Sequence, residues 1–126
     1  MDTVMPPSGE VATDETLNLI SADKVVGTTV FNRMGDNLGS VYGLMLNKLN
    51  GRVAYAIMSF GGFLGMGESY HPLPWRVLSY DPKMGGYVVD LDRSRLEKAP
   101  SYTRANEPDW TTYPASINAY YAIPPI

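Results

Sequence analysis

Residues 53–78 constrain the fold of this chain more than any other stretch. A predicted strand at residues 52–60 is apolar on both faces: Val53, Tyr55 and Ile57 point one way, and Ala54, Ala56, Met58 and Phe60 the other. Such a strand is central in a sheet or covered on both sides. The preceding Asn50-Gly51 pair is a strong hairpin signal, because both turn positions must accept positive φ.

A glycine-rich connection follows this strand. Four glycines lie within residues 61–67, and Phe63, Leu64 and Met66 stand between them. The segment lacks the Lys-Ser/Thr pair of a phosphate-binding loop and precedes a strand rather than a helix. We therefore interpret its glycines as turn positions that need positive φ. The three apolar side chains either pack under their own sheet or meet another chain.

The other elements are short and separated by turn signals. Further strands are predicted at residues 28–31, 38–49, 70–73, 75–80 and 87–91. The alternation of apolar side chains shifts within residues 38–49, and a bulge at Gly39 or Gly43 would explain this shift. The prolines at 72 and 74 favour an edge strand or a bend. The fold class is therefore all-β: a small, mostly antiparallel barrel of five to six strands in meander-like order.

Two capping signals flank the predicted barrel. Ser21 can cap a single helical turn, and Asp92 can cap a short closing helix through Lys98. Leu96 and Ala99 of that closing helix would face the barrel.

The two ends of the chain differ from the middle. Residues 1–16 are polar and acidic, and we expect a disordered leader there. Residues 101–126 form an aromatic extension with a helix predicted at residues 114–121 and an extended end at 123–126. The side chains that share the helical face are Trp110, Tyr113, Ile117, Tyr120 and Tyr121. They either cover their own barrel or build a dimer interface.

Charge and composition narrow the classes of function. The net charge is -3; residues 1–23 hold five acids and no Lys or Arg, and the remainder holds all 10 basic residues and eight acids. Neither part has the basic stripe of a nucleic-acid-binding protein, so direct nucleic-acid binding is not expected. Cysteine is absent, which excludes disulfides and thiolate sites. No run is long enough to span a bilayer and no secretory signal is visible, so we expect a cytoplasmic protein.

Catalytic motifs are not found. His71 is the only histidine, and a lone histidine between Tyr70 and Pro72 is more often structural than catalytic. The acids Asp36, Glu68, Asp90 and Asp92 lack the spacing of a cation site. The chain also has no Gly-x-Ser-x-Gly elbow. We predict no catalytic, cofactor-binding or metal-ligating residues and no cofactor.

Several separate motifs occur in the order typical of one family. They are LISADKVVGTTVFN, GDNLGSV, VAYAIMSFGGFLGMGE, HPLPW and VVDLDRSRLEKAP. Over residues 17–100 the chain resembles the PRC-barrel family, which includes the cytoplasmic domain of the photosynthetic reaction-centre H subunit and the C-terminal domain of bacterial ribosome-maturation factors. The tail resembles an extension of stand-alone bacterial PRC-barrel proteins. The resemblance implies a small β-barrel that takes part in protein–protein interaction or scaffolding rather than catalysis.

We therefore expect a non-catalytic module that binds a protein partner and self-associates as a homodimer. The expected interface residues are Phe63, Leu64, Met66, Trp110, Tyr113, Tyr120 and Tyr121. One alternative is an accessory factor for ribosome maturation or RNA processing, with contacts through Arg76, Arg93, Arg95 and Lys98. A second alternative is a small metal-dependent enzyme.

Overall fold

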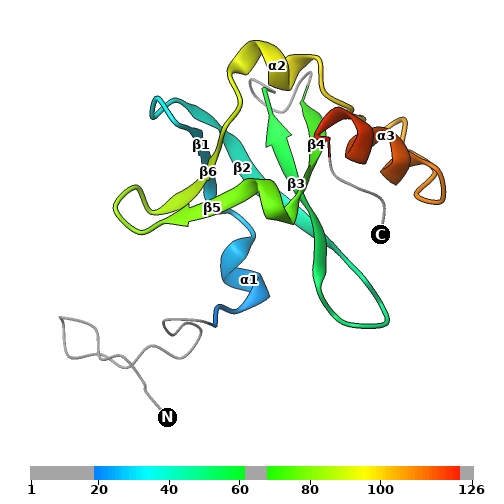
Figure 1. The fold of residues 1–126 in the computed structure, drawn as a ribbon, viewed down its shortest axis with the longest axis horizontal. Helices are drawn as coiled ribbons and strands as arrows, with labels where there is room; N and C mark the ends of the chain where they lie inside the picture. Colours follow the sequence, from blue (N-terminus) through cyan, green and yellow to red (C-terminus); the bar gives the residue numbers. More distant parts are fainter. Residues whose placement is uncertain (1–18, 62–67, 123–126) are drawn as a thin grey trace.

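The computed structural model describes residues 19–61 and 68–122 (Figure 1). Its elements are α1 (Ala22–Val25), β1 (Thr29–Asn32), β2 (Asn37–Leu46), β3 (Val53–Phe60), β4 (Ser69–Pro74), η2 (Trp75–Val77), β5 (Leu78–Asp81), β6 (Gly86–Val89), α2 (Arg93–Glu97) and α3 (Tyr113–Tyr120). The predicted leader at residues 1–16, the side chains Phe63, Leu64 and Met66, and the predicted extended end at 123–126 lie outside the described residues.

The six strands form one mixed sheet in the order β4-β3-β2-β1-β6-β5. All neighbouring pairs are antiparallel except β1 and β6, which are parallel. The prediction of an all-β, mostly antiparallel barrel of five to six strands is confirmed. The meander-like order is correct from β1 to β4 and wrong beyond it. The reason is that the 3₁₀ turn η2 leads from edge strand β4 directly into the opposite edge strand β5, so β6 returns beside β1.

The main apolar core lies within the curved sheet. It is built from Val30, Leu38, Val41, Ala56, Met58, Leu73, Tyr87 and Val89 of the strands, together with Val25, Leu91 and Leu96. The closing helix α2 contributes Leu96 and begins as predicted, because Asp92 Oδ1 accepts a 2.7 Å hydrogen bond from the Arg95 backbone N–H. Ser21 also stands at a helix start, but its side chain makes no capping hydrogen bond to α1.

Strand β3 is buried on both faces, as its sequence predicts. Ala56 and Met58 belong to the main core, whereas Tyr55 and Ile57 belong to a second cluster on the outer face of the sheet. This second cluster is completed by Ile117 of α3, which is fully buried. The outer face of β3 is therefore covered by residues from the C-terminal extension.

The extension reaches this position by pairing with the edge strand. The backbones of Tyr70 and Tyr102 exchange two hydrogen bonds, of 2.9 and 3.0 Å, and Figure 1 shows α3 beside β4. The Tyr70 N–H points away from β3. Backbone N–H groups alternate between the two sides of a strand, so residues 72 and 74 face the same outer edge. Both are prolines and carry no N–H, which blunts the rest of the edge. Of the two alternatives that these prolines favoured, an edge or a bend, the structure has the edge.

Two strand limits differ from the prediction by three residues, and the other limits differ by less. β2 ends at Leu46 rather than at residue 49, because Asn47 Oδ1 accepts the backbone N–H groups of Leu49 and Asn50 and turns the chain early. The strand predicted at 75–80 starts only at Leu78, since residues 75–77 form the 3₁₀ turn η2.

A bulge in β2 was predicted at Gly39 or Gly43, and the ladder is irregular next to both glycines. The register between β1 and β2 shifts next to Gly39, and the register between β2 and β3 shifts next to Gly43. Gly39 has a φ of 155°, and a Cβ at this position would collide with the carbonyl oxygen of Ser59. Only glycine allows β2 and β3 to approach this closely.

Candidate functional site

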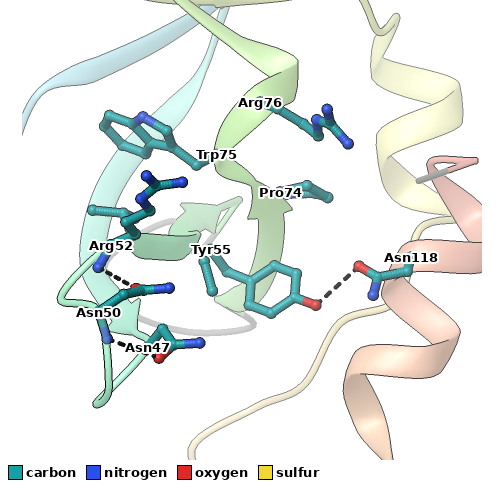
Figure 2. Close-up of a pocket in the computed structure, with 10 residues that line it drawn as sticks. Asn47, Asn50, Arg52, Tyr55, Pro74, Trp75, Arg76 and Asn118 are labelled. Atoms are coloured by element: carbon teal, nitrogen blue, oxygen red, sulfur yellow. Dashed lines mark hydrogen bonds between the residues drawn. The ribbon is translucent and has the colours of Figure 1, made fainter. Parts of the chain in front are cut away.

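A groove of about 470 Å³ lies between the β2–β3 loop, the β4–η2 junction and α3 (Figure 2). Its volume falls in the range of ligand-binding pockets. The residues that line it are Asn47, Asn50, Arg52, Val53, Ala54, Tyr55, Pro74, Trp75, Arg76 and Asn118. They come from three segments that are far apart in the sequence, and we call this feature the groove.

The first wall is the β2–β3 loop, residues 47–52. Asn50 Oδ1 accepts a 2.8 Å hydrogen bond from the Arg52 backbone N–H, and the Asn47 N–H donates to the Arg52 carbonyl at 2.8 Å. Gly51 has a φ of 75°, which completes the turn. These local bonds fix the backbone from which the Arg52 side chain enters the groove.

The opposite wall is the junction of β4 and η2. Pro74 is opposite Tyr55 in the β3–β4 ladder, so the register of these strands sets the distance between the walls. Trp75 is half-buried and packs its ring edge-on against Tyr87, with centroids 5.4 Å apart. The indole is therefore held by the barrel core while part of it stays at the groove, an arrangement that costs little entropy on binding.

Tyr55 connects the groove to the C-terminal extension. Its hydroxyl donates a 2.9 Å hydrogen bond to Oδ1 of Asn118 in α3, as Figure 2 shows. Burial raises the pKa of Tyr55 above its ordinary value, and the hydrogen bond to Asn118 opposes this rise. The phenol therefore stays neutral at physiological pH and acts as a hydrogen-bonding group rather than a charge.

The charges of the groove are of one sign. Arg52 and Arg76 are exposed and line it, and none of the described lining residues is a carboxylate. Within residues 19–61 and 68–122, neither guanidinium forms an ion pair. Guanidinium groups bind carboxylates through paired hydrogen bonds, so the groove is suited to an anionic or acidic ligand.

Comparison with protein families agrees with this architecture. The model of the PRC-barrel domain matches residues 17–96. The chain belongs to the PRC-barrel family. A search of curated proteins found no match. In this PRC-barrel, Asn118 of the groove lies beyond the matched residues, so the groove combines the family domain with the C-terminal extension.

The predicted interface residues of the extension lie mainly against their own barrel. Trp110, Tyr113 and Tyr121 pack on the outer cluster around Tyr55, and Tyr120 donates a 2.6 Å hydrogen bond to the Arg95 carbonyl. Each of these four side chains is half-buried, so part of each remains available to a partner. The other three predicted interface residues, Phe63, Leu64 and Met66, lie outside the described residues.

Two buried hydroxyls in the extension are unusual. Those of Tyr113 and Tyr121 have no hydrogen-bond partner among the described residues. Burial raises the pKa of Tyr113 to about 12 and also raises that of Tyr121. Both phenols therefore stay neutral, and each leaves a hydrogen bond unmade.

His71 has an interior position. It is 1% exposed, its Nε2 lies 3.1 Å from Ser69 Oγ, and its ring packs edge-on against Phe60. Burial lowers the pKa of His71 to about 4. Among the described residues no group of three His, Cys, Asp or Glu side chains could hold a metal ion.

The basic residues considered for RNA contacts have different surroundings. Arg93 donates a 3.1 Å hydrogen bond to the Asn37 carbonyl and lies over the Phe60 ring, while Arg95 lies over the Tyr120 ring. Arg76 is part of the groove, and Lys98 is exposed. In the part of the chain that is described, no helix has the length and apolar character needed to cross a membrane.

Some segments of the groove carry local sequence signals, but these signals do not show that the segments lie together. Asn50-Gly51 was a turn signal and Trp75 belonged to a family motif, yet neither was predicted to be a binding residue. Their proximity depends on the β3–β4 register, which places Tyr55 opposite Pro74. The contribution of Asn118 depends on a contact across 63 positions, for which the sequence offers no local signal.

Proposed function

We propose that this PRC-barrel is a non-catalytic protein-interaction module that self-associates through the groove and the adjoining end of the β2–β3 hairpin. The observation that carries the proposal is the exposure of two leucines next to the groove. Leu49 is 98% exposed and Leu46 is 54% exposed, and both adjoin residues of the first wall. Burying these side chains against a second surface would remove apolar area from water.

The composition of the groove supports the same function. Single exposed apolar side chains are ordinary on protein surfaces. Here the leucines flank Asn47 and Asn50 of a groove that is also lined by Trp75 and Arg52, and Trp and Arg are among the residue types that contribute most binding energy at protein interfaces. Because Trp75 is held in place by the barrel core, it would lose little freedom on binding.

The surroundings of His71 support a non-catalytic role. A general base needs access to a substrate and a pKa near the working pH. His71 is buried in the barrel, and burial lowers its pKa to about 4. Its contacts with Phe60 and Ser69 suit a structural residue of the core.

The proposal is tested by sedimentation velocity over a concentration series. Leu46→Glu/Leu49→Glu should weaken self-association by at least roughly tenfold, since it places charges in an apolar contact. Met34→Glu/Met84→Glu is the matched control: both methionines are exposed and lie outside the groove lining, so association should be unchanged. Equal association by the hairpin variant and the wild-type chain would exclude this surface.

A further inference from the structure

Among the described residues, neither guanidinium group of the groove has a carboxylate partner. Arg52 extends from the β2–β3 loop and Arg76 from η2; Figure 2 shows the Arg52 guanidinium beside Trp75 and the Arg76 side chain directed away from Arg52. The other lining residues are neutral and include three asparagines with amides that can donate and accept hydrogen bonds. A ligand with several carboxylates along its length could meet the two cations and the amides at separate points.

A second hollow on the surface does not have this excess of positive charge. It lies over β1, β5 and β6, has a volume of about 510 Å³ and is lined by Arg33, Asp81 and Asp90 among others. Here the cation is compensated, because Arg33 Nε lies 3.6 Å from Asp90 Oδ1 and Asp81 adds a further acid. An acidic ligand would be repelled from this hollow and attracted to the groove.

The chain itself contains a segment of complementary charge. Residues 1–18 contain Asp2, Glu10, Asp14 and Glu15 and no Lys or Arg, and we call them the acidic segment. The acids are spread along the segment, with Asp14 and Glu15 adjacent, so several carboxylates are available to the two separate guanidinium groups. This charge complementarity is the reason for choosing the acidic segment as the occupant of the groove.

We propose that the groove binds the acidic segment of a second copy of the chain. The inference rests on the proposed self-association and specifies its contacts. Each copy has one groove and one acidic segment, so a reciprocal exchange uses both grooves and gives a closed two-fold dimer. The exposed Leu46 and Leu49 would lie at the rim of the same contact.

The test uses full-length charge-reversal variants. Arg52→Glu/Arg76→Glu makes the groove acidic, and Asp14→Lys/Glu15→Lys makes part of the acidic segment basic. Each variant alone should dimerise at least roughly tenfold more weakly than wild type, because attraction becomes repulsion. An equimolar mixture should form a heterodimer, since the acidic segment of the first variant fits the unchanged groove of the second and the reversed pair attracts as well.

Controls separate this contact from a change in net charge. Lys83→Glu/Lys98→Glu reverses two exposed cations outside the groove and should dimerise like wild type. Thermal unfolding of every variant checks that the barrel is intact. Dimerisation of wild type should also weaken with added salt, because exposed charges are screened.

The outcomes distinguish this inference from the broader proposal. If wild type dimerises and both reversal variants dimerise equally well, the acidic segment is not the occupant, although self-association remains. If the variants are monomeric and their mixture stays monomeric, exchange between copies is wrong. If wild type is monomeric at every concentration, the proposed self-association fails, and this inference fails with it.

Discussion

The hydroxyl of Tyr55 donates a 2.9 Å hydrogen bond to Oδ1 of Asn118, and this contact joins β3 of the barrel to α3 of the C-terminal extension. It lies at the groove, so it ties the position of α3 to the groove wall. The same β3 strand contributes Met58 to the main core. A single strand thus connects the barrel interior, the extension and the candidate binding surface.

Replacing Tyr55 by Phe should lower the free energy of unfolding by about 1 kcal/mol, because it removes this hydrogen bond and leaves the amide oxygen of Asn118 without its partner. Tyr113→Phe is the matched control, since it removes a buried hydroxyl that has no partner among the described residues. That change should be neutral or stabilising. Urea unfolding of the two variants measures the difference, and equal losses of stability would contradict the role of the Tyr55–Asn118 contact.

The close approach of β2 and β3 at Gly39 predicts a position-specific effect. Gly39→Ala should destabilise the fold by about 1–3 kcal/mol, because the new Cβ meets the Ser59 carbonyl and the backbone has a positive φ. Gly43→Ala in the same strand should cost much less, since nothing lies within 4 Å of its added Cβ. Thermal unfolding can compare the two variants. A larger loss of stability for Gly43→Ala than for Gly39→Ala would contradict the close approach of Gly39 to the Ser59 carbonyl.

Because the extension packs on its own barrel, truncating the Ile117 side chain should greatly lower the free energy of unfolding. This side chain is fully buried against Tyr55, Ile57 and Tyr70. Ile117→Ala should cost about 2–5 kcal/mol, measured by urea unfolding. Ala119→Ser, at an exposed position of the same helix, should cost far less. If both substitutions had small effects, the extension would not contribute to folding.

The interior position of His71 predicts a pH dependence with a definite sign. Its folded-state pKa is lowered from 6.5 to about 4, so between these values the unfolded state binds more protons than the folded state. The stability contributed by neutral His71 is complete above pH 6.5 and is lost as the pH falls toward 4. The loss is on the order of 3 kcal/mol.

The measurement that isolates this effect is urea unfolding of wild type and His71→Gln between pH 4 and 8. Carboxylates titrate in both proteins, whereas only wild type has the imidazole. The stability difference between the two proteins should therefore shrink as the pH falls from 6.5 to 4. Parallel pH profiles would mean that His71 is not buried in a neutral state.

The sequence predicted those parts of the fold that depend on local patterns. The two apolar faces of β3 follow from a period of two, and the Asp92 cap and the Gly39 bulge each depend on one residue with a distinct preference. The turn at Trp75 was missed because aromatic and β-branched residues favour strands, and the local sequence does not show that η2 must join two sheet edges.

The candidate site was harder to predict because it depends on contacts between segments that are far apart in the sequence. Its walls meet through the pairing of β3 with β4, and one lining residue belongs to α3. The extended length assigned to β2 also concealed the loop, because Asn47 ends the strand through side-chain hydrogen bonds that compete with the ladder. Side chains such as Arg52 and Trp75 therefore became a site only when the sheet was assembled.

Sedimentation equilibrium of the wild-type chain over a wide range of concentrations tests the central claim most directly. Self-association through the groove and hairpin end predicts an apparent mass that rises toward twice that of the single chain. The mass should return toward the single-chain value for Leu46→Glu/Leu49→Glu at the same concentrations. A single-chain mass for wild type at every concentration would contradict the account.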